Sequence, residues 1–148
     1  MSVPVSTNLN LNSSEHMNLQ KNTNKKISVL LLDDEFEIFK KLTKVFENQE
    51  KFSVIGQASS CRIGTVMIQT YQPEIVIFNA NMTSVASEEA PGIIRKMIAQ
   101  SPNTRIVAIV RENSSNQIFR VLKAGASSCL SIDSIGEDLT TYLSQVLE

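Results

Sequence analysis

The sequence has few of the residues that build disulfide-rich, metal-binding or nucleotide-binding proteins. Its 148 residues include no tryptophan, two cysteines and one histidine. Two cysteines cannot build a disulfide framework, and no cluster of Cys and His has metal-ligand spacing. We therefore expect Cys61 and Cys129 to be reduced thiols in or near a core. The glycine-rich loops that bind dinucleotides or nucleoside triphosphates are also absent.

Charges of the two signs are balanced, and hydrophobic runs are short. The chain has 14 Lys and Arg against 15 Asp and Glu, so no global positive field attracts nucleic acid or an anionic membrane. The longest apolar stretches fall short of the roughly 18 to 20 residues that cross a bilayer, and no basic-then-apolar signal peptide opens the sequence. The sequence therefore predicts a cytoplasmic protein whose partners are proteins.

Residues 1–26 differ from the rest of the chain. This segment is dense in Asn, Ser and Thr and has no sustained apolar period, so it cannot bury enough surface to offset the entropy of ordering. We expect a disordered tail over residues 1–26 and one folded domain over residues 27–148. His16 lies in the tail, and we interpret it as a solvated residue rather than a catalytic base.

From Ile27 onward, short apolar runs alternate with segments of helical period, which is typical of a parallel sheet with crossover helices. Strands are predicted at Ile27–Leu32, Phe52–Ala58, Glu74–Phe78, Arg105–Val110 and Ser128–Ile132. Helices are predicted at Glu35–Asn48, Arg62–Tyr71, Gly92–Gln100, Asn116–Ala124 and Ile135–Leu147, with Gly125 closing the fourth. The first helix has one apolar face made of Phe36, Phe39, Leu42, Val45 and Phe46.

Five strand-and-helix pairs predict an α/β fold of the flavodoxin-like type. This is a doubly wound, five-stranded parallel sheet with five helices, arranged as a three-layer sandwich. Ligands of such sheets bind outside the carboxyl ends of the strands. A fragment of a larger sheet of the nucleotide-binding type is the alternative, but no phosphate-binding loop supports it.

Two adjacent carboxylates, Asp33 and Asp34, directly follow the first predicted strand. At such a position they could form half of a magnesium site. Alternatively, Asp34 caps the first helix, and Glu37 three residues later completes a reciprocal capping box. A cap would not exclude weak metal binding, so both interpretations stay open.

Four segments occur in a characteristic order: LLDDE at 31–35, VIGQAS at 54–59, PEIVIFNANM at 73–82 and VLKAGASSCL at 121–130. In these segments the chain resembles the CheY-like receiver domain of bacterial response regulators, and most closely the receivers that precede a helix-turn-helix in NarL/LuxR-type regulators. The resemblance covers Ile27 to Glu148. It implies a role in two-component phosphorelay signal transduction.

The resemblance assigns a role to each position of the receiver pocket. Asp33 and Asp34 match the acidic pair that helps to hold magnesium. Asn79 falls on the aspartate that accepts the phosphoryl group, and an amide cannot form the acyl phosphate that a carboxylate forms. The remaining positions also depart from the pattern: Val110 replaces a phosphate-binding Ser or Thr, Ile132 replaces a lysine, and Cys129 replaces the switch aromatic.

These departures are consistent with one another. Without the acceptor's negative charge, a partly buried lysine would be costly, and Ile132 removes that cost. Val110 places an apolar, strand-favouring side chain where a ligand no longer arrives. We expect no required cofactor, and at most weak magnesium binding by Asp33, Asp34 and Asn79. Alternatively, Asn79 merely forms a hydrogen bond with a neighbouring loop.

The segment from Thr83 to Pro91 is longer than in the family and contains Glu88 and Glu89. It borders the pocket, so it could cover the pocket or form a partner surface. A solvated insertion is the interpretation that we favour, because loop closure cost grows slowly with length.

The sequence thus predicts a non-enzymatic pseudo-receiver that acts by phosphorylation-independent protein interaction. The expected partners are a signalling protein, a transcription regulator or a histidine kinase, and a homodimer could form through the predicted elements Asn116–Ala124, Ser128–Ile132 and Ile135–Leu147. The alternative is a metal-dependent phosphoacceptor that uses a non-standard residue, for which Asp33 and Asp34 are the only nearby carboxylates. Direct DNA binding is not expected, because the chain has no basic stripe and no separate helix-turn-helix.

Overall fold

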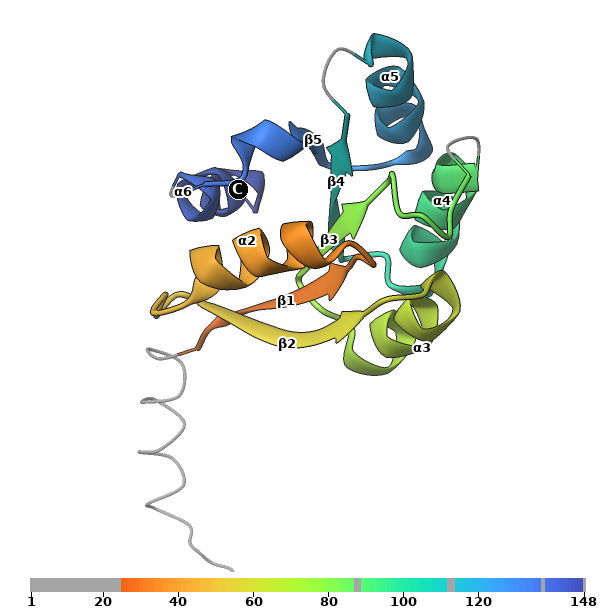
Figure 1. Ribbon diagram of the computed structural model, residues 1–148. Coiled ribbons are helices and arrows are strands. Elements are labelled where there is room, and N and C mark those ends of the chain that lie inside the picture. Colours follow the sequence, from red (N-terminus) through yellow and green to blue (C-terminus); the bar gives the residue numbers. More distant parts are fainter. Residues whose placement is uncertain (1–24, 87–88, 112–113, 137, 148) are drawn as a thin grey trace, which may run out of the picture.

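The computed structural model describes residues 25–86, 89–111, 114–136 and 138–147. Most of the expected tail, including His16, lies outside these residues. Five parallel strands form one sheet in the order β2-β1-β3-β4-β5, as predicted for a flavodoxin-like fold (Figure 1). The strands are β1 (Ile27–Leu32), β2 (Phe52–Ala58), β3 (Ile75–Asn79), β4 (Arg105–Val110) and β5 (Ser128–Ser131). The α-helices are α2 (Phe36–Phe46), α3 (Cys61–Tyr71), α4 (Ala90–Gln100), α5 (Ser115–Ala124) and α6 (Leu139–Val146).

Helices cover both faces of the sheet, which confirms the three-layer sandwich. α2 and α6 pack on one face, and α3, α4 and α5 pack on the other (Figure 1). The central strands β3 and β4 are therefore buried on both sides, which explains their continuous apolar sequences. Successive residues of a strand point to opposite faces. Ile75 and Ile77 accordingly face α2, whereas Ala108 and Val110 face the other layer.

Element boundaries agree with the prediction to within two residues, except at the start of α6. α2 begins at Phe36, whose side chain is 68% exposed, so the prediction that Phe36 lies on the apolar face is wrong. α6 begins at Leu139 rather than Ile135, because a short 3-10 helix at Ile132–Ser134 follows β5. Ile132 and Ile135 still pack on the α2 side, which explains their apolar spacing. Gly125 ends α5 as predicted, with a left-handed φ of 119°.

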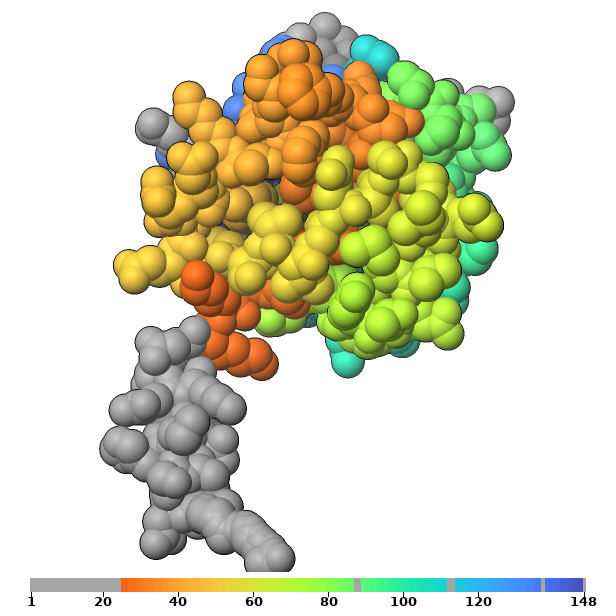
Figure 2. Space-filling view, turned by 60° about the horizontal axis from the view of Figure 1, so that its bottom comes forward, coloured from red at the N-terminus to blue at the C-terminus, as the bar shows by residue number. Residues whose placement is uncertain are grey.

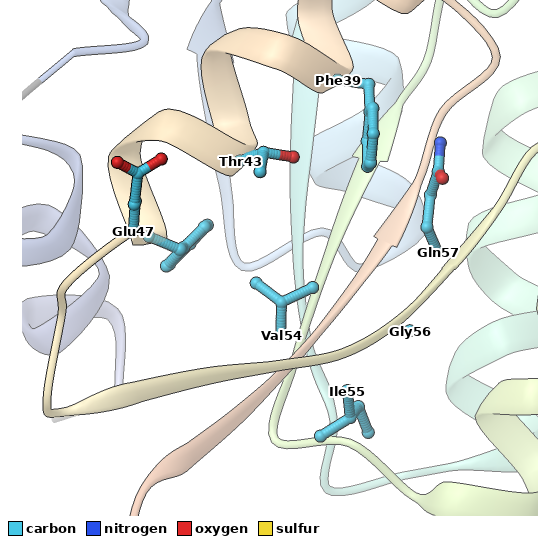
Figure 3. A pocket seen from close by; sticks show the side chains of 8 residues that line it. Phe39, Thr43, Glu47, Val54, Ile55, Gly56 and Gln57 are labelled. Atoms are coloured by element: carbon cyan, nitrogen blue, oxygen red, sulfur yellow. The ribbon is translucent and has the colours of Figure 1, made fainter.

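The strand β2 lies at one edge of the sheet and contains a bulge. Val29 pairs with Val54, but Leu30 pairs with Gly56, so Ile55 is an extra residue. A shallow groove of about 440 Å³ runs between α2 and β2 (Figure 3). Val54 and Gln57 point toward α2 across this groove, whereas Ile55 points to the opposite side of the strand (Figure 3). The groove is distinct from the carboxyl ends of the strands, although it reaches toward them at Gln57.

Within the described residues, no helix is long and apolar enough to cross a membrane.

Candidate functional site at the carboxyl ends of the strands

The side chains of Asp33 and Asn79 meet where β1 and β3 end. These two strands are neighbours in the sheet, and both side chains are fully buried. Asn79 Nδ2 donates to Asp33 Oδ1 at 2.8 Å and to Glu35 Oε2 at 2.7 Å. Asn79 Oδ1 accepts the backbone N–H of Asn81 at 2.9 Å. One amide therefore joins the loop after β1 to the loop after β3.

The orientation of the Asn79 amide follows from its surroundings. Its two N–H donors face two carboxylate oxygens, and its carbonyl oxygen faces a backbone N–H. Reversing the amide would place an oxygen against Asp33 and Glu35 and leave the Asn81 N–H without its acceptor. Because buried polar groups need complementary partners, only the observed orientation satisfies all three groups. The expectation that Asn79 bonds a neighbouring loop agrees with the Asn81 contact.

Asp33 carries one satisfied and one unsatisfied carboxylate oxygen. Oδ1 accepts from Asn79 and from the backbone N–H of Glu35, the latter at 3.1 Å. Oδ2 is buried and has no hydrogen-bond partner among the described residues. Burial raises the pKa of Asp33 above its ordinary value, since the two hydrogen bonds do not fully oppose the desolvation, and the charges of Glu35 and Asp34 add to the rise.

Asp34 holds the loop after β3 rather than the start of α2. Its Oδ1 accepts the Thr83 N–H at 3.0 Å. Its Oδ2 accepts the Thr83 hydroxyl at 2.8 Å, and the Ser84 N–H and hydroxyl at 3.1 Å each. Burial acts to raise the pKa of Asp34, but these four hydrogen bonds outweigh it, and the pKa lies below its ordinary value.

The prediction that Asp34 caps α2 is therefore wrong. The N-cap position is Glu35, and no side chain caps the helix there. Asp34 lies one residue before the cap position, and its carboxylate is already satisfied by the four donors from residues 83 and 84. A capping box with Glu37 does not form.

A hydrogen-bonded chain continues from Asn79 to α5. Gln117 Nε2 donates to Asn81 Oδ1 at 3.0 Å, and Gln117 Oε1 accepts the backbone N–H of Arg111 at 3.3 Å. The backbone next to Asn79 is also fixed, because the Ala80 N–H donates to Ile109 O at 3.0 Å. Sequence reasoning missed Gln117, since nothing in the spacing of residues 81 and 117 signals their contact.

The other residues of the predicted pocket contribute packing. Val110 is almost completely buried in the cluster under α3, α4 and α5, and the half-buried Cys129 packs against the same cluster. Ile132 is half-buried on the opposite side, beneath α2 and α6. Burial raises the pKa of the Cys129 thiol, so the thiol stays protonated at neutral pH. None of the three side chains meets the Asn79 amide through a polar contact.

The loop after β3 is more closely packed than a solvated insertion. Val85 is buried in the core, and Ala90 and Pro91 already belong to α4, two residues earlier than predicted. The solvated-loop interpretation is therefore wrong for Val85. The Glu89 carboxylate accepts the Ala86 N–H at 3.0 Å. Residues 87–88, including Glu88, lie outside the described residues.

The residues at the strand ends do not fit a divalent cation in this arrangement. The orphaned Oδ2 of Asp33 is a suitable oxygen ligand, but Asn79 directs N–H donors toward the acids. Both oxygens of Asp34 are bound to Thr83 and Ser84. In the described part of the chain, no three side chains of the His, Cys, Asp or Glu type are grouped to hold a metal ion. A cation would need the amide reversed and Asp34 released.

We expect Asp34→Ala to lower the melting temperature at neutral pH, by the equivalent of about 1 to 2 kcal/mol for a charged acceptor lost from several hydrogen bonds. A carboxylate whose pKa is lowered by folding stabilises the protein above its unfolded-state pKa, and this contribution disappears as the pH falls through the folded-state value. The difference between the variant and the wild type should therefore close below about pH 4.

Thermal unfolding followed by circular dichroism between pH 7 and pH 3 tests this expectation. The control is Asp133→Ala, at an exposed carboxylate in the turn after β5, which should not alter the pH profile. A gap between Asp34→Ala and wild type that stays constant over this range would show that the ionised carboxylate does not hold the loop.

We expect Asn79→Asp to destabilise the fold at pH 7 by roughly 2 to 3 kcal/mol, since two hydrogen bonds are lost and a third carboxylate faces Asp33 and Glu35. The new carboxyl group would have a raised pKa, so the destabilisation should diminish as the pH falls and the group is protonated. Added magnesium should restore part of the loss by neutralising the carboxylates.

The measurement is the melting temperature of the variant with and without magnesium, from pH 7 down to pH 4. Asn103→Asp, at an exposed position in the turn after α4, makes the same chemical change away from other acids and is the control. An Asn79→Asp protein as stable as wild type at pH 7 would mean that the amide is not the group that holds the acids together.

Comparison with known proteins identifies one family for this fold. A family model described as the response regulator receiver domain matches residues 29–144. The transcriptional regulatory protein DegU of Brevibacillus brevis is 25% identical over 114 residues, which cover 77% of this chain and 47% of DegU. The nitrate/nitrite response regulator NarL of Escherichia coli is 25% identical over 118 residues, covering 80% of this chain and 53% of NarL. The chain thus spans about half the length of these curated relatives.

Solved structures show the same fold at low sequence identity. A response regulator from Thermotoga maritima superposes with a TM-score of 0.71 at 18% identity, covering 82% of this chain and 98% of that one. The isolated REC domain of RcsB from Salmonella enterica gives a TM-score of 0.71 at 15% identity, covering 80% and 86%. The family match extends over most of the chain and includes both strand ends of the site. This chain therefore belongs to the response regulator receiver domain family.

Proposed function

We propose that this receiver domain is a phosphorylation-independent interaction module, in which information enters by contact with a protein rather than by covalent marking. The observation that carries the proposal is the position of Asn79, whose Nδ2 is bound to both Asp33 and Glu35. The module would have no enzymatic activity of its own. It would act in the cytoplasm within a two-component or transcriptional signalling system.

The chemistry of the residues at the strand ends supports a site that does not accept a phosphoryl group. Forming an acyl phosphate requires a carboxylate oxygen that attacks phosphorus, and Asn79 offers an amide whose nitrogen is occupied by two acids. Val110 and Ile132 supply neither a hydroxyl nor an ammonium group to a phosphoryl group. Of the alternative acceptors, Asp33 is fully buried and Asp34 is bound by four donors. A non-standard phosphoacceptor is therefore the weaker hypothesis.

Magnesium is not required in this proposal. Binding through Asp33, Asp34 and Asn79 would cost the hydrogen bonds of the amide and those of the loop after β3. Magnesium would therefore bind weakly, because the free energy of coordination must first offset the loss of these hydrogen bonds.

The proposed working surface consists of α5, β5 and α6. Gln117 fixes α5 to Asn81, which in turn binds Asn79, so α5 has a defined position without a phosphoryl group. Phe119 and Leu122 of α5 are exposed and available to a partner. The partner would be a signalling protein, a transcription regulator, a histidine kinase or a second copy of the chain. Relatives named as transcriptional regulatory proteins, such as DegU, favour a role in transcription, with any DNA contact made by the partner.

We expect wild-type protein to gain no phosphoryl group when it is incubated with acetyl phosphate and magnesium, as measured by intact mass. Asn79→Asp alone should not be stably labelled either, because Val110 and Ile132 still deny the phosphoryl oxygens their partners. A receiver that keeps the aspartate serves as the positive control. A wild-type adduct of one phosphoryl group would favour the alternative phosphoacceptor.

We expect Phe119→Lys with Leu122→Lys to abolish capture of specific proteins in a pull-down from the source cell. Charged side chains at the centre of an interface must be desolvated without a partner, which disfavours binding. Phe36→Lys is the control, since Phe36 is 68% exposed, against 61% for Phe119 and 43% for Leu122, but lies on α2. Undiminished capture by the α5 variant, or equal loss with Phe36→Lys, would show that α5 is not the working surface.

A further inference from the structure

The edge strand β2 and the helix α3 form a surface that is almost free of charge. The 22 residues from Phe52 to Pro73 include one charged residue, Arg62, although 20% of the whole chain is charged. The solvated face of a helix normally carries charged residues, and α2 does so with three lysines. Depletion of charge on an exposed face is a feature of surfaces that are covered by another segment.

The outer side of α3 exposes large apolar side chains beside its one charged residue, Arg62, and the polar residues Gln69 and Thr70. Its inner side is buried through Gly64, Thr65 and Ile68. Its outer side exposes Ile63 by 51% and Val66 by 60%. Large apolar side chains that are exposed next to one another on a helix are candidates for contact with another segment.

The apolar surface continues from α3 onto β2. The end of the Met67 side chain lies against the backbone of β2 at Gly56. The bulge residue Ile55 precedes Gly56 in β2 and is 38% exposed. We define the neutral face as Ile55, Ile63, Val66, Met67 and Tyr71. Figure 2 shows this side of the molecule, with β2 and α3 in yellow and yellow-green next to each other.

The start of β1 lies beside the start of β2 and beside the residues that follow α3. Ile27 pairs with Phe52, so β1 and β2 begin together. The Ser28 N–H donates to Glu74 Oε1 at 3.2 Å, which places the start of β1 beside the residues that follow α3. Twenty-four residues can span up to ~80 Å when extended, whereas an 11-residue helix is ~16 Å long. The segment before Lys25 is therefore attached near the carboxyl end of α3, and it is long enough to cover this helix.

The composition of the preceding segment matches the neutral face. Before Lys21 its only charged residue is Glu15. Between residues 3 and 11, the four large apolar residues Val3, Val5, Leu9 and Leu11 all stand at odd positions, with the polar Thr7 at the odd position between the two pairs. In an extended chain this period of two places all four side chains on one side. A neutral segment with one apolar side is what a neutral apolar face can bind without burying a charge.

We propose that residues 3–11 dock in cis on the neutral face, with the four apolar side chains against α3 and the asparagines toward water. The segment is too polar to fold alone, but a preformed apolar face supplies the surface that it lacks. Its covalent attachment raises the effective concentration to the millimolar range, about what a short flexible linker provides. The groove between α2 and β2 is a poorer fit, because Glu47 lines it and Lys40 and Lys44 neighbour it on α2.

Methyl NMR of the full chain tests the proposal. Each variant changes only two residues of the native sequence. Leu9→Asn with Leu11→Asn removes half of the apolar side, and should shift the methyl signals of Ile55, Ile63 and Val66 but not that of Leu122 on α5. Asn8→Ser with Asn10→Ser changes the polar side of the same segment and is the control. Unchanged neutral-face methyls in the leucine variant, or shifts confined to Val54 in the α2 groove, would overturn the proposal.

A spin label identifies whose segment binds. A nitroxide at Ser6→Cys, in a chain with Cys61→Ala and Cys129→Ala, should broaden the methyl signals of Ile63 and Val66 within the same molecule. In a second sample, spin-labelled chains of natural isotope abundance are mixed with isotope-labelled chains that carry no spin label. No broadening of the methyl signals is expected in this mixture. Broadening in the mixture would assign the face to a second copy and overturn docking in cis, and so would the absence of broadening in both samples. Neither result bears on α5, so the proposed function is tested separately.

Discussion

The amide nitrogen of Asn79 lies between two carboxylates, and the strand ends around it depend on this arrangement. Asp33 is fully buried, so its negative charge needs a nearby donor. Glu35 accepts a hydrogen bond from the same amide nitrogen, and the backbone N–H of Asn81 donates to the amide oxygen. A single neutral side chain thereby takes the place of a bridging positive charge. The strand ends are held together by groups that belong to the chain itself.

This arrangement extends from the pocket to the helices. Asp34 is free to bind Thr83 and Ser84, since it is not needed at the pocket or at the start of α2. The side chain of Asn81 accepts a hydrogen bond from Gln117, which connects the strand ends to α5. The apolar side chains of Val110 and Ile132 pack into opposite layers of the sandwich instead of meeting across the site. Hydrogen bonds and packing within the chain thus connect the strand ends to both helical layers.

The fold and the meeting of Asp33 with Asn79 were predictable from the sequence for simple reasons. Buried parallel strands are continuous apolar runs, and the carboxyl ends of neighbouring strands lie at the same edge of the sheet. Element boundaries were less certain, because Phe36 and Ile135 continue a helical spacing into residues that are not on a buried helix face. Spacing shows that a residue is apolar and recurrent, but it does not show where the backbone turns.

The direction of the polar side chains could not be predicted. Asp34 has the sequence neighbours of a helix cap, yet donors 49 and 50 residues away bind it instead. Gln117 and Asn81 are 36 residues apart, and only the folded chain brings them together. Such contacts depend on the positions of loops to within an ångström or two, which propensity and periodicity do not determine.

The hydrogen bond from the Ala80 N–H to Ile109 O has a chemical consequence for the lifetime of the molecule. Asparagine ages by deamidation when the next backbone nitrogen attacks the side-chain carbonyl carbon and a succinimide ring closes. Here that nitrogen is tied to β4, and both residues of the Asn79–Ala80 pair are fully buried. Ring closure would require the local sheet to open. The fold thus protects Asn79 from spontaneous conversion to aspartate or isoaspartate.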